Sequence, residues 1–152
     1  MSVQSIIDQK GPHLVTVRPE DTIETAAKLL TANNIGALAV RDAGGAMVGI
    51  ISERDLVCGY ADSGASFISS TVGDLMTKDV VSVQSGESVK EAMAKMSKRH
   101  IRHLPVVDAE GSLQGMISLR DVLRIRLQET EMETDELRAY AIASGGHINH
   151  AG

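Results

Sequence analysis

The chain has 152 residues, with 15 Lys and Arg against 20 Asp and Glu for a net charge of −5, and 43% of its residues are hydrophobic. This length suits one domain or two small domains that share a core, and it excludes a (β/α)₈ barrel, which needs about 250 residues. The acidic balance, with two Tyr, one Phe and no Trp, argues against nucleic-acid binding through phosphate contacts or base stacking.

The sequence carries no sign of a membrane or secretory destination. Its apolar runs stay short of the roughly 20 residues that cross a bilayer, and its first residues lack the basic and apolar regions of a signal peptide. The single cysteine, Cys58, has no partner for an intramolecular disulfide, which fits a reducing compartment. We therefore expect a cytoplasmic protein.

The main feature of the sequence is an internal repeat. Residues 15–57 align with residues 81–123 at a constant offset of 66 and without a gap. Fourteen of the aligned pairs are identical, including Gly49 with Gly115. Because this register is kept through the turns as well as through the apolar segments, the two copies are expected to share one fold.

Each copy opens with a short β-branched segment, at 15–17 and at 80–83, which predicts a strand. The apolar residues after it fall at i, i+3, i+4 and i+7, which is one face of a helix. They are Ile23, Ala26, Ala27 and Leu30 in the first copy and Val89, Ala92, Met93 and Met96 in the second. Thr22 and Ser88 stand at the N-cap positions, and Ser88 with Glu91 predicts a capping box.

Two apolar strands joined by a turn with Asp and Gly come next in each copy. The strands are expected at 37–41 and 47–51, and at 104–107 and 113–117. A second helix then begins at Ser52 or Ser118, so each copy is a β-α-β-β-α unit. One unit of this size buries little surface, and we expect the two copies to pack sheet to sheet in an α/β fold.

The segments outside the repeat are a linker and a C-terminal extension. Small polar residues at 61–66 predict the linker, and 70–76 predict a short helical lead-in to the second copy. Residues 122–143 predict a long helix whose acidic middle is either a solvated face or a docking surface for a basic partner. The tail from Gly145 is expected to fray. The expected boundaries are 1–60 for the first domain, 61–70 for the linker, 71–127 for the second domain, and 128–152 for the helical extension and frayed tail.

The same polar motif follows the third strand of both copies. Gly49–Asp55 and Gly115–Asp121 each read Gly-x-x-Ser-x-Arg-Asp, from the end of a strand into the first turn of a helix. The Ser and Asp, three residues apart, face the same way beside the positive end of the helix dipole. There an ionised Asp can accept both hydroxyl protons of a ribose diol, the Arg can reach a phosphate, and the Gly leaves room for a ligand against the backbone. One copy alone is equally an N-cap with an acidic first turn, but its duplication favours a ligand site.

These features together resemble one known family. The two β-α-β-β-α copies, the string Arg102–Asp108 (RHLPVVD) and both Gly-x-x-Ser-x-Arg-Asp motifs resemble a tandem pair of cystathionine-β-synthase-type (CBS) domains, the Bateman module, over about residues 1–127. The resemblance implies two pseudo-symmetric units packed by their sheets, which often pair further into a flat dimer. It also implies clefts that bind an adenosyl ligand, namely AMP, ADP, ATP, NAD(H) or S-adenosylmethionine.

The resemblance also implies roles for residues of both copies. Asp55 and Asp121 would hold ribose hydroxyls, with Ser52 and Ser118 assisting. The other implied contacts are Arg54 and Arg120 with phosphate, Thr16 and Ser82 in the base pocket, Ile51 and Ile117 as apolar contacts, and Arg102 and His103 with the phosphates of either cleft. The basic run 98–103 occurs only in the second copy, so we expect the two clefts to differ in affinity.

The leading prediction is a stand-alone regulatory module that senses an adenosyl nucleotide and signals to another protein, with no metal and no catalytic cofactor. We expect no enzymatic activity, because the sequence has no nucleotide-binding Gly-Lys loop and no nucleophile paired with a base. The alternatives are a ligand-independent scaffold and a nucleic-acid-binding module that uses 95–103. A homodimer is also expected, from an apolar stripe on the long helix. The stripe comprises Val122, Leu123, Ile125, Arg126, Met132, Leu137 and Tyr140.

Overall fold

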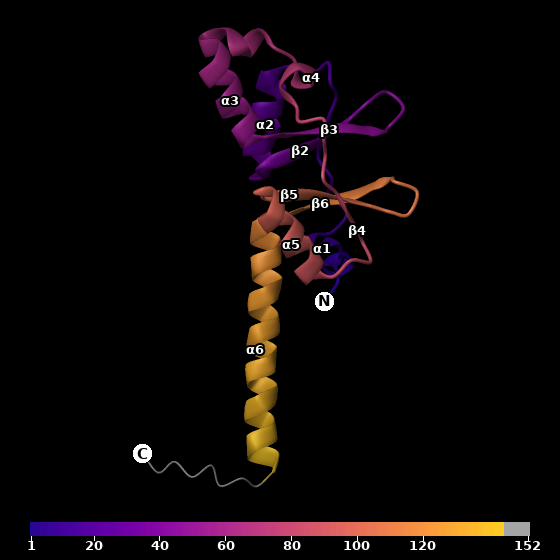
Figure 1. Ribbon diagram of the computed structural model, residues 1–152, viewed down its shortest axis with the longest axis vertical. Coiled ribbons are helices and arrows are strands. Elements are labelled where there is room, and N and C mark those ends of the chain that lie inside the picture. Colours follow the sequence, from indigo (N-terminus) through magenta and orange to yellow (C-terminus); the bar gives the residue numbers. More distant parts are fainter. Residues whose placement is uncertain (145–152) are drawn as a thin grey trace.

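The computed structural model describes residues 1–144, and the tail expected to fray lies outside these residues. Figure 1 shows two αβ units stacked along the long axis of the molecule, with the first copy at the top and the second below it. One long helix, α6 (Leu119–Ala143), leaves the second unit and continues away from the body. This is the α/β fold class that the sequence predicts.

The first unit is a three-stranded sheet with helices packed on it. Its elements are β1 (Thr16–Val17), α2 (Ile23–Asn33), β2 (Ala37–Arg41), β3 (Met47–Ser52), α3 (Glu53–Ser63) and the 3₁₀ segment η1 (Gly64–Ser69). β1 runs parallel to β2, and β2 runs antiparallel to β3. The predicted N-cap of α2 is confirmed, since the Thr22 hydroxyl oxygen accepts the backbone N–H of Thr25 at 3.1 Å.

The second unit repeats this order. Its elements are β4 (Val83–Gln84), α5 (Val89–Arg99), β5 (His103–Val107), β6 (Leu113–Ser118) and α6, and the short helix α4 (Val72–Leu75) precedes them in the chain. β4 runs parallel to β5, and β5 runs antiparallel to β6. The capping box predicted for Ser88 and Glu91 is present at the start of α5. The β-α-β-β-α order is therefore confirmed in both copies.

Two segments differ from the sequence prediction. Residues 61–66 are helical rather than an open linker, because α3 runs into them and η1 follows directly. β4 begins at Val83, so Ser82, the equivalent of Thr16, precedes the strand. The equivalent pairing would join Ser82 to Pro105, which has no N–H to donate to a neighbouring strand.

The two helices that lead into the copies exchange partners. α1 (Val3–Lys10) precedes the first copy in the sequence but places Val3 in the core of the second unit. α4 precedes the second copy but places Val72 in the core of the first unit. Backbone hydrogen bonds fix both contacts, from Val3 N to Glu87 O at 2.8 Å and from Val72 N to Asp21 O at 2.9 Å. The core of each unit is therefore completed by the helix that precedes the other copy in the sequence.

The two cores fix the strand ends that carry the polar motif. Ile51 and Ile117 have 0% of their surface exposed, one in each core. The residues that follow them, Ser52 and Ser118, cap α3 and α6 with complete capping boxes. Because the two isoleucines are packed in the cores, the polar residues that follow them are held in place at the starts of α3 and α6.

Candidate functional site

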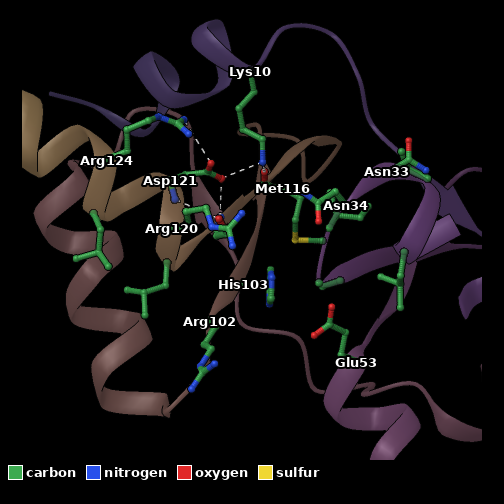
Figure 2. A pocket seen from close by; sticks show the side chains of 18 of the residues that line it. Lys10, Asn33, Asn34, Glu53, Arg102, His103, Met116, Arg120, Asp121 and Arg124 are labelled. Carbon is green, nitrogen blue, oxygen red and sulfur yellow. Dashed lines mark hydrogen bonds and ion pairs between the residues drawn. The ribbon is translucent and has the colours of Figure 1, made fainter.

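A large open cleft, with a volume of about 1730 Å³, lies between the two units. Its walls come from the segment after α1, from the turn between α2 and β2, from the start of β5 and from the start of α6. Figure 2 shows this cleft with Asp121 on the wall of the second unit and Glu53 on the wall of the first. The volume exceeds the 300–1,000 Å³ typical of small-ligand sites, so the cleft has room for a nucleotide and for solvent.

Asp121 is the buried carboxylate of the cleft, with 5% of its surface exposed. Its Oδ2 accepts the backbone N–H of Ser118 at 2.9 Å and the Lys10 Nζ at 2.9 Å, while Arg124 Nη2 lies 3.4 Å from Oδ1. Burial works to raise the pKa of Asp121, but the hydrogen bonds from Lys10 and Ser118 and the charge of Lys10 outweigh it and lower that pKa. Asp121 is therefore held ionised and can act as an acceptor.

Lys10, at the end of α1, reaches the motif of the second copy from the far end of the sequence. Its Nζ donates to Asp121 Oδ2 and also to the carbonyl oxygen of Met116 at 2.9 Å, so it bridges the strand end and the helix start. The dashed lines of Figure 2 mark this bridge. The sequence analysis missed Lys10, because the contact depends on the exchange of α1 onto the second unit.

His103 lies in the middle of the cleft, between Asp121 and Glu53 in the view of Figure 2. A Cβ on Gly36 would lie 2.8 Å from its ring, so only glycine at that position leaves room for the imidazole. Burial lowers the pKa of His103, and the charges of Lys10 and Arg102 act in the same direction against Glu53 and Asp121. The imidazole is therefore biased toward its neutral form, in which one ring nitrogen donates and the other accepts.

The motif of the first copy has a different environment. Asp55 Oδ2 accepts the backbone N–H and the hydroxyl of Ser52, at 2.8 and 3.1 Å, and Oδ1 accepts the Thr77 hydroxyl at 3.1 Å. Thr77 also pairs with Ile50, through hydrogen bonds of 3.0 and 2.8 Å, and so extends the sheet beyond β3. Both carboxylate oxygens of Asp55 are thus engaged by the chain itself.

The glycine of each motif has a neighbour from the same chain, where the sequence predicted room for a ligand. A Cβ on Gly49 would lie 2.7 Å from Met76 Sδ and 2.9 Å from the carbonyl oxygen of Thr77. A Cβ on Gly115 would lie 2.6 Å from Cδ1 of Ile7. The space beside each glycine is therefore occupied by the segment that leads into the other copy.

The structure brings five of the twelve predicted site residues together in this cleft. They are Arg102, His103, Ser118, Arg120 and Asp121. Ser52, Arg54, Asp55, Thr16 and Ser82 belong to the described residues outside its lining, and Val15 rather than Thr16 faces the cleft. Ile51 and Ile117 point into the two cores, so they support the site from behind instead of offering the predicted apolar contact.

The cleft also contains polar residues with acidic or basic side chains that sequence reasoning missed. They are Lys10, His13, Glu53, Arg124 and Glu131. Of these, Arg124 carried a usable signal, because it lies three residues after Asp121 and thus on the same helix face. Glu53 carried one as well, since it directly follows the Ser of the first motif.

Positive charge is concentrated at this motif and not at its counterpart. Four cationic side chains line the cleft, namely Lys10, Arg102, Arg120 and Arg124. At the positions 66 residues away, the other copy has Met76, Gly36, Arg54 and Cys58. The two motifs therefore differ in positive charge by more than the basic run 98–103 alone accounts for.

Comparison with known proteins identifies this arrangement. The family model described as the CBS domain matches the chain twice, over residues 7–61 and 72–128. The chain belongs to the CBS domain family. Solved structures of CBS pairs share the fold, and the CBS-domain containing protein ATU1752 from Agrobacterium tumefaciens is 41% identical with a TM-score of 0.79, covering 82% of this chain and 92% of that one.

Two similar CBS structures hold adenosyl compounds. CBSX2, in complex with AMP, is 30% identical with a TM-score of 0.71 and covers 85% of this chain and 98% of that one. The CBS domain pair of MJ0100, in complex with 5′-methylthioadenosine and S-adenosyl-L-methionine, is 29% identical with a TM-score of 0.76 over 85% of this chain and 98% of that one. CBS pairs of this fold therefore include proteins that bind adenosyl ligands.

Curated relatives differ in how much of their length this CBS pair represents. The chain spans 70%, 60% and 22% of the first three. The last is an inosine-5′-monophosphate dehydrogenase from Methanocaldococcus jannaschii, 37% identical over 113 residues, so that match concerns only part of the enzyme. Within residues 1–144 of the present chain, no helix is long and apolar enough to cross a membrane.

Proposed function

We propose that this CBS pair is a regulatory module, and not an enzyme, that binds one anionic adenosyl nucleotide per chain beside Asp121. The observation that carries the proposal is the meeting, in a single cleft, of an ionised, ribose-type carboxylate with Arg102 and Arg120, which form no ion pair among the described residues, whereas Lys10 and Arg124 pair with the carboxylate itself. A carboxylate accepts sugar hydroxyls, and cations neutralise phosphates. The similar CBS pairs in complex with AMP or with S-adenosylmethionine support an adenosyl ligand.

The lining of the cleft gives the nucleotide a direction. Ribose hydroxyls meet Asp121, and Arg120 on the same helix start lies beside the phosphate path. Both His103 and Arg102 line the cleft, with His103 in its middle and the Arg102 side chain extending toward its lower edge in Figure 2. The partly buried Val15 offers an apolar wall for the adenine ring, a role that the sequence analysis gave to its neighbour.

The homologous motif at Asp55 is not proposed to hold a phosphorylated ligand. At the positions equivalent to the cations of the cleft, Met76, Gly36 and Cys58 replace three of the four. A phosphate placed there would gain the attraction of Arg54 alone among the four equivalent positions. We therefore expect one anionic nucleotide per chain.

The test compares two conservative variants at equivalent positions. Calorimetric titration with AMP is expected to give a measurable dissociation constant for the wild type and for Asp55→Asn, and no binding or much weaker binding for Asp121→Asn. Each hydrogen bond to a charged acceptor contributes about 1.5–3 kcal/mol, so 2′-deoxy-AMP should bind roughly 10- to 100-fold more weakly than AMP. Equal affinity of the two variants, or no heat with AMP, ADP, ATP, NAD(H) or S-adenosylmethionine at millimolar concentration, contradicts the proposal and leaves the scaffold.

The regulatory output requires a second protein surface. The nucleotide touches both units, so it favours one relative orientation of them over others, and it shifts the equilibrium only by its difference in affinity between those orientations. We propose that the module works as a homodimer and that a regulated partner protein reads this orientation. The partner is defined here only by that role.

A further inference from the structure

The two units contribute different residues to the middle of the cleft. The backbone N–H of Glu53 donates to the carbonyl oxygen of Gly36 at 3.0 Å. The equivalent bond of the second unit runs from Leu119 to Arg102 at 2.8 Å. Three equivalent positions therefore line the cleft from both sides, and they are Gly36, Ala37 and Glu53 in the first unit and Arg102, His103 and Leu119 in the second.

The carboxylate of Glu53 points toward the middle of the cleft and is unpaired. Figure 2 shows its side chain directed toward His103. A Cβ on Gly36 would lie 3.9 Å from Cδ of Glu53 and 2.8 Å from the His103 ring, so the two side chains border the same small space. Glu53 takes part in none of the ion pairs within residues 1–144. The start of α3 does not need it as a cap, because Asp55 completes the capping box.

No positive charge at this point offsets the carboxylate of Glu53. Burial lowers the pKa of His103, so its ring is biased toward the neutral form and offers a hydrogen bond without a charge. The Arg102 side chain extends toward the lower edge of the cleft in Figure 2, away from the space beside His103. Glu53 therefore sets the sign of the charge in the middle of the cleft.

The opposite wall of the cleft is fixed and carries less negative charge. Val122 and Ile125 are fully buried in the second unit, which corrects their assignment to an exposed stripe of α6 and holds the start of this helix in place. Asp121 is the one acidic residue in the first turn of α6, whereas the first turn of α3 has both Glu53 and Asp55. The two helix starts that line the cleft thus differ in charge.

The number of phosphates on a nucleotide decides how closely it approaches Glu53. With the ribose at Asp121, the first phosphate lies beside Arg120, and further phosphates extend into the middle of the cleft. Each added phosphate brings negative charge toward an unpaired carboxylate, and like charges at short range disfavour binding. We propose that Glu53 is a specificity-determining residue that makes this site prefer adenosine monophosphate to the triphosphate. The inference rests on the proposed function, which places the ribose at Asp121.

Two other kinds of ligand would use a carboxylate at this position differently. A magnesium-bound triphosphate would bring a divalent cation to Glu53, but within residues 1–144 no three His, Cys, Asp or Glu side chains are grouped to hold a metal ion. S-adenosylmethionine would bring its sulfonium and ammonium groups, but Arg102 and Arg120 in the same cleft repel cations. The lining therefore favours the monophosphate, and the test includes both of these ligands.

Calorimetric titration of the wild type and of Glu53→Gln, with AMP and with ATP in the presence of a chelator of divalent cations, tests the proposal. The wild type should bind AMP more tightly than ATP. In Glu53→Gln the affinity for ATP should rise more than the affinity for AMP, which changes the ratio of the two dissociation constants by roughly 5- to 10-fold. Because Glu53 is exposed, added salt should reduce this change.

The matched control is Glu131→Gln. Glu131 also lines the cleft, but it lies ten residues after Asp121 on α6, or about 15 Å along the helix. The control removes one negative charge from the same cleft away from the phosphates, so the ratio should keep its wild-type value. A second variant, Glu53→Leu, introduces the residue of the equivalent position 119 and should change the ratio in the same direction as Glu53→Gln, because both remove the charge.

The possible outcomes separate this inference from the proposed function. AMP binding with an unchanged ratio in Glu53→Gln overturns the inference alone, and so does an equal change in Glu131→Gln. ATP binding that requires Mg²⁺ and is lost in Glu53→Gln would make Glu53 a metal contact and also overturns it. The same holds for a preference for S-adenosylmethionine over AMP that is lost in this variant. Absence of AMP binding to every variant contradicts the proposed function, and this inference with it.

Discussion

Three of the roughly four acceptor positions of Asp121 are engaged in the described chain before any sugar arrives. One lone pair of Oδ2 takes the Ser118 N–H and the other takes Lys10, while Oδ1 lies at 3.4 Å from Arg124. A ribose diol needs two acceptor positions, and the bond from Lys10 is the one on Oδ2 that can be released without uncapping α6. Lys10 is therefore an internal competitor for the sugar.

The substitution Lys10→Met tests this competition, with Met being the residue at the equivalent position 76. The free protein is expected to lose about 1–3 kcal/mol of unfolding free energy, because the buried carboxylate loses a charged hydrogen bond. Adenosine, which carries no phosphate, should bind severalfold more tightly, because Oδ2 is then available. Urea unfolding and calorimetry with adenosine measure the two effects.

The control for this substitution is Lys28→Met. Lys28 pairs with Glu24 on the exposed face of α2, where solvent screens the pair and leaves it little effect on stability. It should change neither quantity appreciably. If Lys10→Met left adenosine affinity unchanged, Lys10 would not compete with the sugar, and if it reduced the affinity, Lys10 would be a direct ligand contact.

Strand edges distinguish the two units at the scale of elements. The outer edge of β3 is paired through Ile50 with Thr77, whereas the carbonyl of Met116 on β6 takes the side chain of Lys10 instead. A backbone neighbour holds a fixed position, while a side chain can move. The same position of the repeat is therefore rigid in the first unit and adaptable in the second.

Alanine at the two motif glycines should show this difference. In Gly49→Ala the new Cβ meets the backbone carbonyl of Thr77 at 2.9 Å, and we expect a loss of about 1–3 kcal/mol from overpacking. In Gly115→Ala it meets only the end of the Ile7 side chain, which can change rotamer, so the loss should be smaller. Urea unfolding of both variants provides the comparison, and equal losses would show that edge pairing does not constrain β3.

The same contrast explains which parts of the fold and of the site could be predicted from the sequence. The repeat, the apolar periods and the caps predict β2, β3, α2 and their copies, because these patterns act between near neighbours. The exchange of α1 and α4 was not predicted, and with it went the contact between Lys10 and Asp121, which are 111 residues apart. Asp121 itself was predicted from its motif. The difference in charge between the two motifs was not fully predicted, because it depends on which lead-in segment covers which motif.

At the scale of the whole molecule, apolar side chains of both units line the cleft. Leu123 and Leu127 on α6 line it from the second unit, and Val57 on α3 lines it from the first. A nucleotide that joins the two units at Asp121 fixes the placement of α3 relative to α6. It thereby fixes the outer faces of these helices, on which the proposed homodimer depends.

Nucleotide binding and pairing should therefore strengthen each other by one common factor. Couplings of this kind are typically about 1–3 kcal/mol, or roughly 5- to 150-fold, and linkage requires the factor to be the same in both directions. Leu137 belongs to the apolar stripe expected to pair, is 69% exposed and lies outside the lining of the cleft. Leu137→Glu should therefore give a monomer that binds AMP more weakly by that factor, as measured by light scattering and calorimetry. If the monomeric variant bound AMP as tightly as the wild-type dimer, nucleotide binding and pairing would be energetically independent.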